Sequence, residues 1–285
     1  DLIKGRPDAM HKRKVQNGAY VHNTARIRRD ITSATRSDRF PITAAEGLYV
    51  GRETYDTIMG RIYNSPLRAK RDYAYSCLNF CLLMDMEQRL TSQPHDRFVT
   101  DSIFAPLGAY TTCYRPTLHH KLADIASTEV DNYLRNQHLR GYVHDELANF
   151  SGGVQGNAGL FSNADDLAKI CQMWLNGGVY GDRRVLSEET VRLFTTSKSP
   201  TCRRGLGFDK PDTEDLENSP TCDEADASVY GHLGFTGTVF WVDPANDMIF
   251  VFLTNRVDPT RDNAAFSKVN IRPELFRQLY KALDK

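Results

Sequence analysis

Two short stretches of this 285-residue chain carry side chains that can move a proton. Tyr75-Ser76-Cys77 comes just before a run with helical periodicity, and His232-Leu233-Gly234 opens a run with strand periodicity. A phenol can act as a general base if a nearby cation lowers its pKa from about 10. A glycine on an edge strand lets a ligand backbone approach and pair with the strand. Each stretch alone is also typical of a residue without a catalytic role. Tyr75 could simply cap a helix entry, and His232 could be a surface histidine on an edge strand.

Thiol chemistry is the alternative that the cysteines raise. Six are present and none has the spacing of a metal site: Cys77, Cys81, Cys113, Cys171, Cys202 and Cys222. The pattern favours free thiols and core fillers, although Cys202 and Cys222 could pair in an oxidising compartment. Cys77 as nucleophile with His232 as base would make a thiol hydrolase. We favour this less, because a buried structural cysteine is the commoner case.

Composition excludes several classes of function. The formal net charge is zero, which argues against a general affinity for nucleic acid or anionic membranes. No apolar run approaches the roughly 18 to 20 residues that span a bilayer. The opening "DLIKGRPDAMHKRK" has no signal-peptide pattern and no initiator Met, which indicates a fragment or a processed form. The basic first forty residues are predicted to be a solvated surface excursion.

Periodicity predicts the elements that position these side chains. Helices are expected within 53–65, 75–93, 96–104, 163–176, 187–196 and 272–285. The helix within 75–93 should be buried through five residues, Leu78, Cys81, Leu82, Met86 and Leu90. Ser162 is the expected N-cap of the helix within 163–176, and Gly177-Gly178 its end. The stretch from about 109 to 145 is expected to be irregular.

The last third of the chain switches to strands. "TVFWVD" and "MIFVFLTN", separated by "PAND", predict an antiparallel hairpin. The predicted fold is therefore α+β, with a helical region over an antiparallel sheet. We expect one domain over 1–285, with a mainly helical and loop region over 44–200. The sheet hairpin and the C-terminal helix should occupy 201–285.

From about Ala44 to its end, the chain resembles the penicillin-binding-protein-like serine hydrolases, which include class C β-lactamases, D-alanyl-D-alanine peptidases and related esterases. "YSCLNFCLLMDMEQRL" looks like the family's Tyr-x-Asn motif and the helix behind it. "GYVHDELANFSGGVQGNAGLFSNADDLAKI" is similar to the long signature that follows. "RRGLGFDKP" followed by "GHLGFTGTVFWVDPANDMIFVFLTNRV" looks like the third motif, usually Lys-Thr-Gly or His-Thr-Gly, and its hairpin. The residues of these stretches most resemble a branch of the family that is fused behind a family-3 glycoside hydrolase in envelope proteins.

The resemblance implies a serine β-lactamase-like fold and acyl transfer through a serine ester. A Ser-x-x-Lys motif would supply the nucleophile and its lysine partner. Tyr75 would shuttle the proton, and His232 would add positive or hydrogen-bonding character beside it. Backbone near Phe235 would offer one N–H to the oxyanion hole. Substrate contacts would fall to Cys77, Leu233, Gly234, Phe235, Asn157 and His144; for Asn157 and His144 we favour a role in holding the loops that border the cleft.

Three departures from the family pattern bear on activity. Cys77 stands where the second motif ends in Asn or Asp, and Leu233 replaces the threonine of the third motif. No lysine has a serine three residues before it; the nearest pattern is Thr195-Thr196-Ser197-Lys198. We therefore expect the nucleophile upstream, outside these 285 residues, and the chain to be inactive alone. The alternative is a non-catalytic binding module that retains the cleft.

The resemblance also implies partners and a location. Expected substrates are D-alanyl peptides from cell-wall turnover, β-lactams or simple esters, in the periplasm or cell envelope. A glycoside hydrolase domain is expected on the N-terminal side in the parent chain, and no nucleic acid. No cofactor is implied, because this chemistry needs none. His119-His120 do not predict a metal site, because adjacent histidines in a strand point apart.

Overall fold

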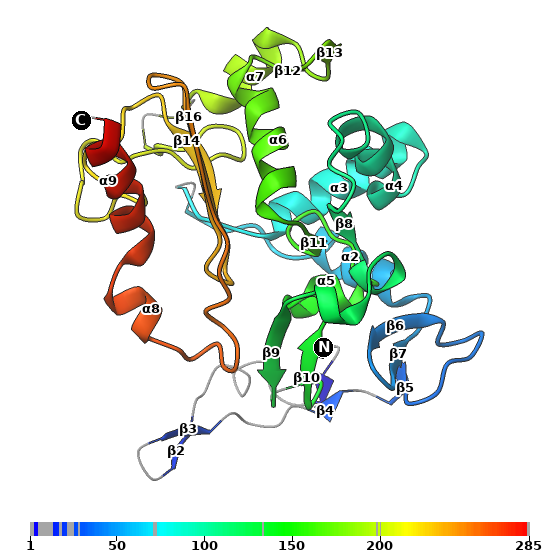
Figure 1. Cartoon of the computed structure of the whole chain (residues 1–285). Helices are drawn as coiled ribbons and strands as arrows, with labels where there is room; N and C mark the ends of the chain where they lie inside the picture. Colours follow the sequence, from blue (N-terminus) through cyan, green and yellow to red (C-terminus); the bar gives the residue numbers. More distant parts are fainter. Residues whose placement is uncertain are drawn as a thin grey trace.

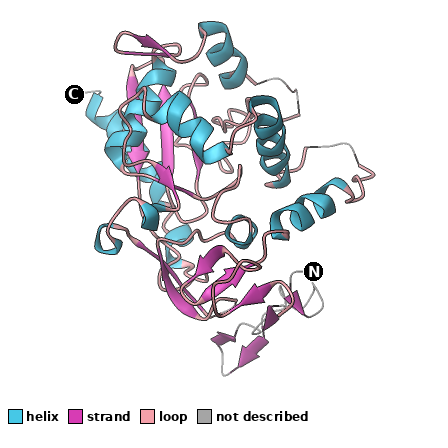
Figure 2. Cartoon of the chain, turned by 90° about the vertical axis from the view of Figure 1, so that its right-hand side faces the viewer, coloured by secondary structure: helices cyan, strands magenta, loops and turns pink. Residues whose placement is uncertain are grey.

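The computed structural model describes residues 3–4, 14–16, 19–21, 26–27, 29–70, 73–132, 134–197, 199 and 201–283. Much of the basic segment that was predicted to be a surface excursion lies outside these residues. Helices and antiparallel strands alternate through the described part (Figure 2). None of its helices is long and apolar enough to cross a membrane.

A three-stranded antiparallel sheet forms the centre of the C-terminal half. Its order is β14 (Tyr230–Leu233), β15 (Val239–Asp243) and β16 (Met248–Phe252). Helix α9 (Ile271–Leu283) covers one face and α6 (Ala164–Leu175) the other (Figure 1). The predicted hairpin and terminal helix are confirmed.

Strand alternation explains why this sheet is covered on both faces. Successive side chains of a strand point to opposite faces. Trp241 and Phe250 therefore pack on Phe276 of α9, while the neighbouring Val242 packs with Cys171 of α6. Two separate clusters thus clamp β15 between two helices, and β14, which carries His232, is held in register against it.

The helical region lies on the far side of α6 from the sheet (Figure 1). Its longer helices are α2 (Thr54–Tyr63) and α3 (Leu78–Thr91). Its shorter helical elements are α4 (His95–Val99), the π-helix η1 (Thr100–Phe104), the 3₁₀ helices η2 (Pro116–Leu118) and η3 (Leu122–Asp124), and α5 (Glu146–Phe150). Two helices lie elsewhere: α7 (Glu188–Thr195) near one end of α6, and α8 (Ala265–Lys268) on the side of the sheet that α9 covers (Figure 1). Because α6 packs on the sheet, the proposed division near residue 200 separates halves that share a core.

Short strands complete the fold. They are β1 (Ile3–Lys4), β2 (Lys14–Gln16), β3 (Ala19–Val21), β4 (Arg26–Ile27), β5 (Thr32–Ser33), β6 (Ile42–Ala45), β7 (Leu48–Val50), β8 (Cys113–Tyr114), β9 (Ser127–Asp131), β10 (Gln137–Arg140), β11 (Leu160–Phe161), β12 (Val179–Tyr180) and β13 (Arg183–Arg184). All six cysteines are free, so the pairing of Cys202 with Cys222 does not form.

The predicted buried face of α3 is right for Cys81 and wrong for Leu78, Met86 and Leu90. Leu90 is 83% exposed and Met86 54%, whereas Cys81, Met84 and Asp85 are buried. The reason is polar: the Asp85 carboxylate accepts hydrogen bonds from Tyr63 of α2 and from Arg89. This bonding turns the acidic side of α3 toward α2 and leaves part of the apolar stripe outside.

Two further expectations are corrected. The N-cap of α6 is Asn163, whose Oδ1 accepts from the Asp166 N–H, while Ser162 instead bonds the hydroxyl of Thr112. The stretch predicted to be irregular contains the antiparallel pair β9–β10. Strand β9 buries Thr128, Glu129 and Asp131, so apolar alternation never marked it as a strand.

Candidate active site

Tyr75 and His232 come together from the two halves of the molecule. Tyr75 lies three residues before α3, and His232 is the third residue of β14. Their ring centroids are 6.2 Å apart, with the planes inclined at 38°. Tyr75 is 59% exposed, so a ligand can reach it from solvent. The two groups singled out for proton chemistry therefore face one place.

A third residue, Arg204, joins this pair. Its Nη1 donates to Nε2 of His232 at 3.0 Å, and its Cζ lies 5.1 Å from the centroid of the Tyr75 ring. Its Nη2 donates to the buried Asp209 carboxylate at 2.7 Å, and Arg203 bonds the same carboxylate. Sequence reasoning missed Arg204, because an arginine in a loop is usually a solvated charge. The only local signal was a doubled arginine five residues before an aspartate.

The hydrogen bonds define the proton on His232. Its Nδ1 lies 2.7 Å from the carbonyl oxygen of Leu233, so Nδ1 carries the proton and donates. Nε2 then keeps a lone pair, which accepts from Arg204. Burial lowers the pKa of His232 and the charge of Arg204 adds to the effect, outweighing the Leu233 carbonyl. His232 therefore brings hydrogen bonding to the site and leaves the positive charge to Arg204.

The phenol of Tyr75 is neutral near pH 7. Partial burial and the neighbouring Cys77 raise its pKa, and the charge of Arg204 opposes them without prevailing. A cation does lie beside the ring, as general-base chemistry would require, but it does not bring the pKa below the ordinary value. In this arrangement Tyr75 can donate a proton or relay one.

The turn after β14 is held in one shape. The Gly234 N–H donates to the Thr238 carbonyl at 2.7 Å, and a Cβ on Gly234 would lie 2.0 Å from Thr238 Oγ1. Arg256 Nε donates to the carbonyl of Phe235 at 2.8 Å, and its guanidinium lies 4.7 Å from the Phe235 ring. The backbone at Phe235 is thus fixed, which an oxyanion-hole donor requires.

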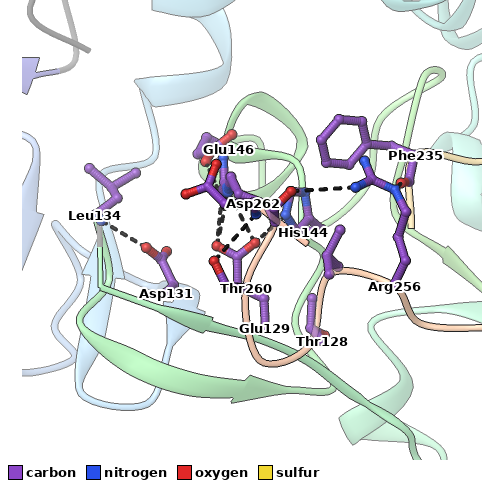
Figure 3. Close-up of polar contacts among 12 residues, drawn as sticks. Thr128, Glu129, Asp131, Leu134, His144, Glu146, Phe235, Arg256, Thr260 and Asp262 are labelled. Atoms are coloured by element: carbon purple, nitrogen blue, oxygen red, sulfur yellow. Dashed lines mark hydrogen bonds and ion pairs between the residues drawn. The ribbon is translucent and has the colours of Figure 1, made fainter. Parts of the chain in front are cut away.

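A second charged cluster borders the turn. The His144 ring lies 5.1 Å from that of Phe235, and His144 Nε2 bonds Glu129 (Figure 3). Arg261 donates to Glu129 at 2.8 Å and to Glu146 at 2.9 Å. Burial alone would raise the pKa of Glu129, but the hydrogen bonds from His144 and Arg261 outweigh it and lower that pKa. His144 thus holds β9 and its own loop against Phe235.

The other residues assigned to substrate contacts have folding contacts. Asn157 Oδ1 accepts from the Cys81 thiol at 3.5 Å, which ties the signature loop to α3. Leu233 packs partly against the sheet core. Cys77 is an exposed thiol at the entrance of α3. Neither of two surface cavities, of about 530 and 270 Å³, is lined by Tyr75 or His232.

Known proteins are similar to this chain over most of its length. The family model described as Beta-lactamase matches residues 30–269. A protein of Escherichia coli (strain K12) named "Putative D-alanyl-D-alanine carboxypeptidase" is 37% identical over 233 residues, 76% of this chain and 53% of that protein. A protein of the same name from Salmonella gallinarum is 34% identical over 219 residues, 72% of this chain and 50% of the relative. The chain spans about half the length of the curated relatives it matches.

Solved structures with a similar fold are more distant in sequence. A mutant of simvastatin synthase from Aspergillus terreus has a TM-score of 0.55 at 17% identity, covering 81% of this chain and 61% of the other. A penicillin-binding protein homologue from Caulobacter crescentus has a TM-score of 0.51 at 15% identity, covering 78% and 63%. The predicted α+β, β-lactamase-like fold is confirmed.

Proposed function

Because this chain belongs to the beta-lactamase and penicillin-binding-protein-like family of serine hydrolases, we propose that Tyr75 and His232 serve acyl transfer through a serine ester. The observation that carries the proposal is the approach of their rings to 6.2 Å from opposite halves of the fold. In the proposed site His232 orders the groups around Tyr75 by hydrogen bonding. The fixed backbone at Phe235 offers an N–H to the developing oxyanion.

The proposed reaction uses the serine of a Ser-x-x-Lys motif, a pattern that these 285 residues do not contain. The serine Oγ attacks the carbonyl carbon, its proton passes to the leaving group by way of Tyr75, and the scissile C–N or C–O bond breaks. Water then hydrolyses the serine ester. Since no Ser-x-x-Lys occurs in these 285 residues, we propose that other polypeptide contributes the serine and lysine. The 285 residues alone would then be inactive.

D-Alanyl peptides of the cell wall are the substrate class we propose first. The names of the two relatives support this choice, and β-lactams and simple esters remain substrates to test. With such substrates, the location we propose is the periplasm or cell envelope. A glycoside hydrolase domain N-terminal to this chain would suit a role in cell-wall turnover.

Paired assays test the proposal. Hydrolysis of nitrocefin, p-nitrophenyl acetate and a D-alanyl-D-alanine peptide should be absent for residues 1–285 and present once the chain is extended upstream to a Ser-x-x-Lys motif. In the extended protein, Tyr75→Phe should lower kcat by about 10²- to 10⁴-fold, as expected for lost proton transfer. Tyr63→Phe is the matched control, because Tyr63 is half exposed and bonds only Asp85 of α3. Turnover by residues 1–285, or full activity of Tyr75→Phe, would refute the respective claim.

A non-catalytic binding module is the second candidate. It is favoured by Leu233, which packs toward the sheet core where the family pattern has a threonine, and by the raised pKa of Tyr75. An upstream sequence without Ser-x-x-Lys, together with peptide binding without turnover, would favour it.

A thiol hydrolase based on Cys77 is less well supported. Both ring nitrogens of His232 are engaged, one with Leu233 and one with Arg204, and neither is directed to the thiol. Iodoacetamide labelling at neutral pH would reveal Cys77 if it reacted faster than the other five thiols.

A further inference from the structure

We propose that Arg204, anchored by Asp209, is a positioning residue that keeps His232 as the neutral Nδ1–H tautomer and carries the permanent positive charge against the Tyr75 ring. Any importance of Arg204 for catalysis rests on the proposed function. Its effect on the tautomer of His232 does not depend on that function. Three features of the structure support it, namely the anchor, the hydrogen bonds of the imidazole and the stacking on the phenol.

The anchor ties Arg204 to the strand that carries His232. Asp209 is 1% exposed and accepts from both Arg203 and Arg204. Its own backbone forms a two-bond bridge with Gly231, at 2.7 Å and 3.0 Å. Gly231 directly precedes His232 on β14. Arg204 therefore cannot move far from the imidazole without loss of a buried ion pair or the bridge.

The hydrogen bonds around His232 favour one protonation state. The Leu233 carbonyl accepts from Nδ1, and Arg204 presents an N–H to Nε2. A proton on Nε2 would point its N–H at the N–H of Arg204. If Nδ1 kept its proton, the imidazolium would also lie beside the guanidinium cation, which is unfavourable in a partly buried site. The charged or titratable groups of the described residues that face the ring are Arg204, Asp209 and Tyr75, while Phe240 lies opposite on β15.

The guanidinium also fixes the phenol. Its carbon lies 5.1 Å from the centre of the Tyr75 ring, within the range in which a cation is attracted to an aromatic face. An arginine stays charged at every pH at which the protein is folded. The positive charge beside Tyr75 is therefore independent of pH, which a protonated histidine could not provide.

A matched pair of arginines supplies the test. Arg203 binds Asp209 as Arg204 does but is not bonded to His232, so Arg203→Gln controls for loss of an ion pair. The imidazole of His232 is followed by ¹⁵N and ¹³C NMR during titration of residues 1–285, with Arg204→Gln and Arg203→Gln alongside. We expect His232 of the unmodified chain to show the Nδ1–H tautomer and to titrate below its ordinary value of 6.5.

The outcomes separate the alternatives. In Arg204→Gln the pKa of His232 should rise toward 6.5, and in Arg203→Gln it should move less. Equal shifts in the two variants would overturn the proposal. So would the Nε2–H tautomer, or titration at or above 6.5 in the unmodified chain, a result that needs no folded variant.

Activity gives a second readout in the chain extended to a Ser-x-x-Lys motif. Arg204→Gln should move the acid limb of the pH profile of kcat to higher pH, with a loss of about tenfold per pH unit once His232 is protonated. Arg203→Gln should move that limb less. If the extended chain has no activity at any pH while the NMR result holds, the proposed function fails and the role of Arg204 in setting the tautomer stands.

Discussion

Two histidines on either side of one turn are bonded to the same kinds of residue in opposite order. His144 bonds the carboxylate of Glu129, which is bonded in turn by Arg261. His232 instead bonds the guanidinium of Arg204, which is bonded in turn to Asp209. The first imidazole contacts an anion directly, and the second contacts a cation.

This difference separates a structural cluster from the candidate site. The Glu129 cluster links β9, the loop of His144 and the segment of Arg261, and its charges are met within the fold. The Asp209 cluster leaves one side open, where the exposed Tyr75 lies against Arg204 and His232. Both clusters contain a histidine, an arginine and a carboxylate, so their composition does not distinguish them. They differ in whether the carboxylate or the arginine contacts the imidazole.

The largest effect is expected on removing the carboxylate of the structural cluster. Glu129→Gln should lower the free energy of unfolding by about 3–5 kcal/mol, because it leaves a partly buried guanidinium with less counter-charge. Urea unfolding measures the loss. Glu224→Gln, which breaks the surface pair with Arg277, should cost less than about 1 kcal/mol. Similar losses in both variants would show that the Glu129 cluster is not a stabilising unit.

A smaller effect is expected at the turn between the two clusters. Gly234→Ala should destabilise the fold by about 1–3 kcal/mol, because the added Cβ would overlap Thr238 Oγ1. Gly60→Ala in α2 is the matched control, since a Cβ there meets open space, and it should stabilise the protein by up to about 1 kcal/mol. We expect the thermal unfolding temperature to fall in Gly234→Ala and to rise in Gly60→Ala. An unchanged unfolding temperature in Gly234→Ala would mean that the turn adjusts to the added Cβ at little cost.

Phe235 touches the first cluster through His144 and follows His232 of the second by three residues in the chain. Phe235→Ala should cost about 0.5–1 kcal/mol, because the exposed ring loses its contacts with His144 and the guanidinium of Arg256. Leu90→Ala removes a side chain that is 83% exposed and should leave the free energy of unfolding unchanged. Chemical denaturation distinguishes the two, and no loss in Phe235→Ala would show the ring to be energetically idle.

The smallest effect is a slope with pH. The folded chain holds the pKa of His232 below 6.5, so as pH falls through 6.5 the unfolded chain binds more protons and stability decreases. His232→Gln should remove this contribution and flatten the stability curve between neutral pH and the lowered pKa. Unfolding free energies of both proteins across this range measure it. Parallel curves would contradict the neutral imidazole.

Local patterns were enough for much of the fold. Alternation through Val239–Asp243 predicted β15 because its side chains meet two apolar layers, and the period of 3.6 predicted α9. Strand β9 was missed because it buries Thr128, Glu129 and Asp131, which are satisfied by ionic and polar partners rather than by apolar contact.

Long-range contacts limited what could be predicted of the site. Motif resemblance selected Tyr75 and His232, and the structure brings them together. Arg204 depends on a contact with His232, 28 residues away, and on another with Tyr75 from the other half of the chain. No periodicity encodes such contacts. The face of α3 was misassigned for the same reason, because Asp85 draws its partner Tyr63 from α2.

Under the proposed function, the bridge between Asp209 and Gly231 limits where a substrate could be cut. Residues of a strand turn their N–H and C=O groups to a given edge alternately. On the outer edge of β14, Gly231 is occupied by Asp209, and the carbonyl of the next such residue, Leu233, already accepts from His232. We therefore expect only one or two peptide units of a ligand to align there, which favours trimming at chain ends over cleavage in the middle of a polymer.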